Sequence, residues 1–201
     1  MTQIENQKSQ LAETIRSYHQ KGWSPATSTN YSFRMATDLD RIYVSRSGVD
    51  KSQFLSTDFM EIDRSGNPMP DFKSVKPSAE TLIHCVLYDL FPDTEVILHS
   101  HSIYSVLMSQ RFAGSVPFRG YEIQKGFQGQ TTHDAEIYVP ILENSQDMVE
   151  FSAWMHKEKA EFSNHCFIIR NHGAYAWGRN LFEAKRHLET LEYLLQVEFL
   201  R

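Results

Sequence analysis

Cysteine is scarce in this chain of 201 residues. The two that occur, Cys85 and Cys166, each stand in an apolar run, and no CxxC pairing is present. This usage argues against a disulfide framework and against a zinc site built from thiolates. A reducing compartment suits such a chain, so we expect a cytoplasmic protein.

Excess positive charge and long apolar runs are also lacking. Lysine and arginine total 20 against 25 for aspartate and glutamate, which gives a net charge of −5. We therefore expect no basic surface that gathers nucleic acid or anionic lipid. No stretch approaches the roughly 18 apolar residues of a membrane span, and the polar start, MTQIENQKSQ, differs from a signal peptide. We expect a soluble protein with neither nucleic acid nor membrane as a partner.

Internal repeats, low-complexity tracts and long linkers rich in Pro, Gly or Ser are absent as well. The composition, 41% hydrophobic and 22% charged, is that of an ordinary globular chain. A length near the usual domain size of about 150 residues predicts one domain, residues 1–201.

The apolar spacing predicts several helices. One runs from about Ile4 to Gly22, a second opens near Pro77 and Ser78 and extends to about Asp89, and residues 148–159 look helical. The last helix starts at Asn180, with Glu183 three residues on as in a capping box. Its apolar stripe comprises Leu181, Ala184, Leu188, Leu191 and Leu195.

Short β-like runs lie between these helices, and residues 63–70 are expected to form a turn and loop. The predicted strands are residues 31–35, 41–45, 95–99, 136–139, 166–170 and 174–177. The pattern indicates an α/β fold with α+β character, in which a mixed, largely antiparallel sheet is flanked by helices.

The nine histidines are the most informative residues of the chain. His99 and His101 follow an apolar run, and residues two apart on a strand point to the same side. His172 ends another apolar run, and three histidines with an open fourth position are typical of catalytic zinc. The alternative is that strand-end histidines bond only to backbone. His19, His156 and His187, on predicted helices among charged residues, are expected to be solvated.

Three loops are dense in small hydrogen-bond donors: residues 28–30, 45–48 and 76–78. Hydroxyls, amides and backbone N–H groups at turns can bind a phosphate, although turns commonly contain such residues in any case. Glu80 and His84 share one face of the predicted second helix, as an incidental pair or as a contact beside the metal.

Three motifs together resemble the class II aldolase and adducin-head family: PSAE at 77–80, HSH at 99–101 and NHG at 171–173. The resemblance covers nearly the whole chain, from the TSTN loop at Thr27 to the C-terminal helix. Two positions depart from the aldolase pattern, because Thr29 stands where glycine is usual and Ala79 where a second serine is usual. These departures concern the phosphate contacts and not the metal.

This resemblance implies a class II aldolase-like fold, a sugar-phosphate substrate and homo-oligomers, commonly tetramers, with active sites at subunit interfaces. It implies one Zn2+ ion per subunit on His99, His101 and His172. It places the substrate phosphate on Thr27, Asn30, Ser47, Gly48 and Ser78.

Within the family, residues 120–125, 132–134, 139–141 and 143–147 resemble a branch that removes water from a ketose phosphate. Such a lyase needs a carboxylate to take the proton beside the carbonyl and an acid to protonate the departing hydroxyl. We assign the main acid/base role to Glu122, and a role as fourth metal ligand or helper to Glu80.

Other reactions start from the same metal site. An aldolase that cleaves a ketose phosphate, or an epimerase, is the nearest alternative, and a non-catalytic adducin-like interaction module is a further one. Phe118, Tyr121 and Phe127 are candidates for lining the apolar end of the substrate, or they build core.

Overall fold

Eight strands form one mixed sheet in the computed structural model, which describes residues 2–201. Their order is β3-β2-β1-β4-β8-β7-β6-β5, and every neighbouring pair is antiparallel except β6 with β7. The strands are β1 (Tyr31–Met35), β2 (Asp38–Ser45), β3 (Phe59–Ile62), β4 (Val96–Ser100), β5 (Ser115–Phe118), β6 (Ile137–Leu142), β7 (Cys166–Ile169) and β8 (Gly173–Gly178).

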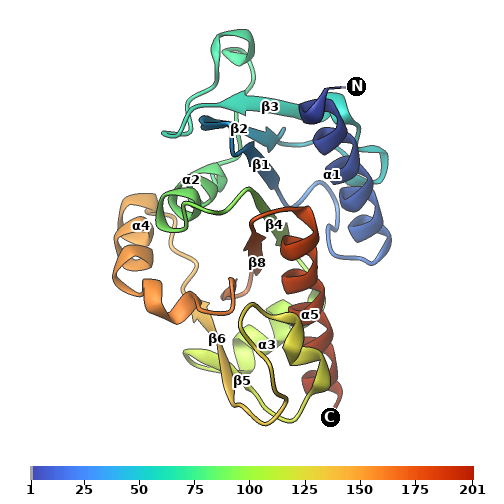
Figure 1. The fold of residues 1–201 in the computed structure, drawn as a ribbon, viewed down its shortest axis with the longest axis vertical. Coiled ribbons are helices and arrows are strands. Elements are labelled where there is room, and N and C mark those ends of the chain that lie inside the picture. Colours follow the sequence, from blue (N-terminus) through green and yellow to red (C-terminus); the bar gives the residue numbers. More distant parts are fainter. Residues whose placement is uncertain (1) are drawn as a thin grey trace.

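Helices cover both faces of this sheet (Figure 1). On one face lie α1 (Gln3–Gln20), α3 (Ile103–Arg111) and α5 (Leu181–Leu200), and on the other α2 (Thr81–Leu90) and α4 (Met148–Lys157). Short 3-10 helices lie in the connections: η1 (Lys51–Gln53), η2 (Ser56–Asp58), η3 (Pro70–Phe72), η4 (Glu122–Gly126) and η5 (Lys159–Phe162).

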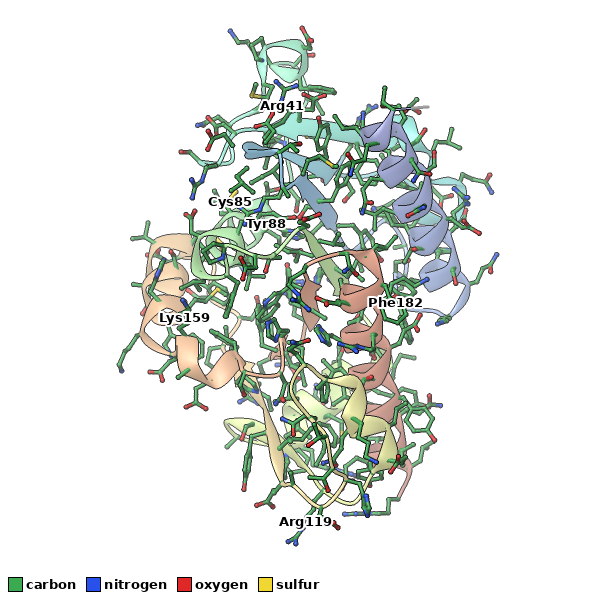
Figure 2. The ribbon with its side chains drawn as sticks, in the orientation of Figure 1. Arg41, Cys85, Tyr88, Arg119, Lys159 and Phe182 are labelled. Atoms are coloured by element: carbon green, nitrogen blue, oxygen red, sulfur yellow. The ribbon has the colours of Figure 1, made fainter. Side chains whose placement is uncertain are left out.

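Alternation along the central strands divides the apolar side chains between two cores. Val96 and Leu98 of β4 join the core beneath α1 and α5, whereas Ile97 joins the core beneath α2 and α4. Tyr88 extends from α2 toward β1 (Figure 2), where its hydroxyl lies 2.8 Å from that of Ser32. His99, two residues after Ile97, therefore faces the α2 side.

The predicted fold class is confirmed, and most predicted elements lie within two or three residues of the observed ones. Two strands and one α-helix escaped prediction: β3, β5 and α3. The predicted start of the second helix at residues 77–78 is wrong, because residues 78–81 form a turn in which Thr81 N donates to Ser78 O (3.0 Å), and the helix begins at Thr81.

His187 is a second correction. It is fully buried on α5, and its Nδ1 donates to the carbonyl oxygen of Trp177 over 2.7 Å. The expected solvation fails because this face of α5 packs on β8. His156 is exposed, as expected, and His19 is half-buried. Among residues 2–201, no helix combines the length and apolarity needed to cross a membrane.

Candidate metal centre and substrate site

Four side chains converge beside the end of β4: Glu80, His99, His101 and His172. One donor atom from each lies within 4.8 Å of all the others. His172 Nε2 is 3.0 Å from Glu80 Oε1, and His99 Nε2 is 3.5 Å from Glu80 Oε2. The Nε2 atoms of His99 and His101 are 2.7 Å apart. The three predicted metal ligands and the predicted helper carboxylate therefore share one site.

The sheet topology produces this convergence. His99 lies near the end of β4, and the antiparallel partner β8 begins immediately after His172. Gly173 allows the two strands to approach, because a Cβ atom at that position would lie 2.0 Å from the carbonyl oxygen of Ser100. Asn171, in the preceding turn, has φ of +57°, a conformation that asparagine tolerates better than most residues.

Hydrogen bonding and stacking orient His99. Its Nδ1 donates to the carbonyl oxygen of Ala174 over 2.9 Å, which leaves the Nε2 lone pair directed at the cluster. The ring stacks on Tyr175 with centroids 4.0 Å apart. Burial lowers the pKa of His99 well below its ordinary value and that of His101 to about 4. Both rings are therefore neutral, which is the form that binds a metal.

Glu80 supplies the negative charge of the cluster. Burial by itself would raise its pKa, but the hydrogen bond with His172 lowers the pKa below its ordinary value. Three imidazole nitrogens and one carboxylate are a donor set that suits a divalent ion such as zinc. The residues present therefore fit a metal centre.

A chain of hydrogen bonds holds the Glu80 carboxylate in place. Asn30 Nδ2 and the Tyr175 hydroxyl both donate to Oε2, the latter over 3.3 Å. Asn30 Oδ1 in turn bonds to His84 Nε2, and His84 Nδ1 bonds to Ser32 Oγ over 2.7 Å. The contact between Glu80 and His84 that their helical spacing suggested therefore runs through Asn30.

The small-donor loops enclose a polar cavity of about 110 Å³ next to the cluster. Glu80 and His101 form its inner wall. The rest of the lining includes every residue assigned to phosphate binding: Thr27, Asn30, Ser47, Gly48 and Ser78. Thr29, where the family usually has glycine, adopts φ of +70°, which is strained for a β-branched residue.

Lys51 is a neighbour of these loops that the sequence analysis missed. It is 1% exposed, and its Nζ donates to the carbonyl oxygens of Val49 (3.0 Å) and Thr27 (3.5 Å). Burial lowers its pKa, while Asp50 and Asp58 oppose that shift. A cation at this point supports the loop and favours an anion in the cavity.

Glu122 lies apart from the cluster within its own chain. It begins η4, its side chain is 75% exposed, and its carboxylate pairs with Lys125 (2.7 Å) and His133 (3.6 Å). Phe118 and Phe127 are buried in the core beneath α5, and the Tyr121 hydroxyl donates to Glu198. These three aromatic residues therefore do not line the cavities beside the cluster.

Glu192 is a further residue that escaped prediction. It is 2% exposed on α5, and its carboxylate accepts hydrogen bonds from the hydroxyls of Ser100 and Ser102, the neighbours of His101. The apolar stripe of α5 gives no sign of a buried charge at this position.

Known proteins share much of this sequence and this fold. The family model "Class II Aldolase and Adducin N-terminal domain" matches residues 9–199. A protein named methylthioribulose-1-phosphate dehydratase from Picosynechococcus sp. is 49% identical over 96% of this chain and 92% of its own length. One of the same name from Xanthomonas campestris pv. campestris is 41% identical, over 94% and 86%.

Solved structures share the fold at low identity. An L-fuculose 1-phosphate aldolase superposes with a TM-score of 0.78 at 19% identity, over 97% of this chain and 85% of its own. The L-fuculose-1-phosphate aldolase from Thermus thermophilus gives 0.71 at 21%, over 94% and 90%. The resemblance seen in the three motifs is thus confirmed, and this chain belongs to the class II aldolase and adducin family.

Proposed function

We propose that this chain is a zinc-dependent methylthioribulose-1-phosphate dehydratase, a carbon–oxygen lyase of methionine salvage. The product would be 2,3-diketo-5-methylthiopentyl 1-phosphate. One observation carries the proposal: Glu80 and three histidines converge beside a polar cavity, in a chain 49% identical to a protein of that name.

The reaction sets clear chemical demands. The substrate has a ketone at C2, hydroxyls at C3 and C4, a phosphate on C1 and a methylthio group on C5. Dehydration removes the C3 proton and the C4 hydroxyl, and the resulting enol becomes the 2,3-diketone. A carboxylate must accept the first proton, and an acid must protonate the leaving hydroxyl.

The residues of the site suit the phosphate end of this substrate. The loops around Asn30 and Ser47 offer hydroxyl, amide and backbone donors, and Ser78 completes the cavity. His99, His101 and His172 would hold one zinc ion, with Glu80 as the exchangeable fourth ligand. When bound, zinc supplies the Lewis acidity that makes the C3 proton removable at neutral pH.

Glu122 would accept the C3 proton, and we infer that it serves the site of a neighbouring subunit. It is exposed, it stands outside the cluster of its own chain, and the family resemblance implies active sites at subunit interfaces. The next residue, Ile123, lines a surface hollow with Phe182, Thr190 and Tyr193, and Ile123, Phe182 and Tyr193 are 43%, 72% and 55% exposed. Such a patch is typical of a subunit contact in a homo-oligomer, here a tetramer.

A Glu122→Gln substitution tests both the reaction and the base. The zinc-loaded wild type should form the diketone from methylthioribulose 1-phosphate. The variant should bind the same amount of zinc but turn over about a hundredfold to ten-thousandfold more slowly, because positioned acid–base groups contribute factors of that size. Glu13→Gln, at an exposed site on α1, should match the wild type.

The other outcomes are equally informative. An active Glu122→Gln enzyme would move the acid/base role to Glu80. A folded, zinc-loaded wild type that forms no diketone would overturn the dehydratase proposal, and two carbon fragments or an epimer among the products would identify an aldolase or an epimerase.

A further inference from the structure

A second cavity, of about 130 Å³, opens from the same metal cluster. Glu80 and His172 form its inner wall, and Ser78 and Glu80 line this cavity as well as the polar one. The metal cluster therefore lies where the two cavities meet. A linear ligand that binds the cluster through its middle can extend into both.

The two cavities differ in chemistry. Hydroxyl and amide side chains dominate the first, whereas apolar side chains form much of the second. These apolar residues come from the turn before α2, from α2, α4 and β7: Ala79, Ile83, Met148, Phe151 and Ile169. Phe151 and Ile83 are 5% and 2% exposed and belong to the core beneath α2 and α4, so this wall is held by packing.

We propose that this second cavity binds the methylthio end of the substrate and selects for it, an inference that rests on the proposed function. The order of groups along the substrate matches the order of the sites: phosphate, oxygens at C2 and C3, then the apolar C5 end. A thioether is polarizable and makes favourable contacts with aromatic rings, which suits a wall containing Met148 and Phe151.

Met148 is the side chain best placed to set this selectivity. It is the first residue of α4, and the Asp147 carboxylate caps that helix by accepting from the backbone N–H groups of Val149 (2.9 Å) and Glu150 (3.1 Å). The cap holds the backbone at Met148 in place. A substitution there changes the shape of the cavity without touching Glu80 or a histidine.

The test compares two substrates: methylthioribulose 1-phosphate and 5-deoxyribulose 1-phosphate, which lacks the methylthio group. An apolar pocket distinguishes one methylene by about 10- to 200-fold, so the wild type should favour the methylthio substrate at least tenfold in kcat/KM. Met148→Trp, which fills the cavity, should lower kcat/KM for the methylthio substrate about tenfold or more and leave the deoxy substrate nearly unchanged. Met148→Ala, which enlarges the cavity, should weaken the preference.

Val149→Trp is the matched control, because Val149 is 81% exposed on the adjacent position of α4. It should keep the selectivity of the wild type. An active wild type whose selectivity survives both Met148 variants would overturn this inference alone. A folded, zinc-loaded wild type that dehydrates neither substrate would overturn the proposed function and this inference with it.

Discussion

Gly173 shows how one missing side chain shapes the candidate metal site. Besides its close approach to Ser100, a Cβ atom there would lie 3.0 Å from ring carbons of both His99 and His101. The neighbours are backbone and buried rings, which cannot move without displacing the ligands. Glycine at this position is therefore required by space rather than by an unusual backbone angle.

A Gly173→Ala substitution should separate β8 from β4 and disturb all three histidines. We expect a loss of about 1–3 kcal/mol in the free energy of unfolding, as for other overpacked sites, together with weaker zinc retention. Urea titration and zinc content after dialysis would measure the two effects. Gly114→Ala should be tolerated, since a Cβ atom there meets nothing within 4 Å.

Glu192 is a buried carboxyl group of α5, on the side of β4 opposite His99. Burial raises its pKa from 4.5 to about 7, although the hydrogen bonds from Ser100 and Ser102 oppose that shift. Because the folded pKa lies above the unfolded one, the folded state binds the proton more tightly. Its stabilising contribution is thus complete below about pH 4.5 and is lost as the pH rises through 7.

Replacing Glu192 with glutamine should remove this pH dependence. Relative to the wild type, Glu192→Gln should gain about 2–3 kcal/mol in unfolding free energy between pH 5 and pH 8, from the size of the shift. Chemical denaturation at both pH values gives the difference. Glu13→Gln, at an exposed site on α1, should show no such trend, and an equal trend in both variants would refute the argument.

At the scale of elements, the segment just before α2 does not follow its local signal for a helix start. A proline and a serine at residues 77–78 suit a helix start, yet α2 begins at Thr81. The turn directs Ser78 into the polar cavity and Glu80 toward the histidines. The demands of the site here override the local signal for a helix start.

The start of α5 follows its local signal instead. Asn180 accepts a hydrogen bond from Glu183 N over 2.9 Å, and Ala184 in the first turn packs against Gly178 of β8. Phe182, in the same turn, points away from the sheet (Figure 2). The cap thus joins a strand of the site to the helix that carries Glu192.

Asn180→Ala should lower the free energy of unfolding by about 1 kcal/mol, the usual cost of a lost N-cap. Thr2→Ala, at the N-cap of the more exposed first turn of α1, should cost less. Denaturation curves of the two variants would compare these costs. A larger effect for Thr2 would contradict the role assigned to the cap of α5.

At the scale of the whole molecule, the proposed assignment of Glu122 to a neighbouring site predicts complementation. Glu122→Gln lacks the base and His172→Ala lacks a metal ligand, so each alone should be nearly inactive. Mixed oligomers should regain activity, because some sites then combine an intact metal centre with an intact Glu122. Assays after co-refolding would detect it, and no recovery in verified mixed oligomers would place Glu122 in its own subunit's site or outside the chemistry.

Local patterns predicted much of the fold but missed two four-residue strands and a helix whose apolar spacing is weak. In α3, Ile103 is 70% exposed while Met108 is buried, so the apolar spacing does not mark the helix face. Strand β5 has only four residues and contains Pro117, which weakens the strand signal. Lys51 and Glu192 escaped for a related reason, because charge in a sequence normally indicates exposure.

The strand-end histidines, the alternation of short strands with helices and the capped terminal helix are local patterns, so the candidate ligands and the fold class could be predicted from the sequence. The packing of distant elements brings Glu80 to His99, His101 and His172, and it brings Asn30 and His84 to the support of Glu80. The same packing leaves Glu122 apart from the cluster and forms an apolar cavity beside the polar one. Such contacts depend on how helices pack on the two faces of a sheet, which no short stretch of sequence specifies.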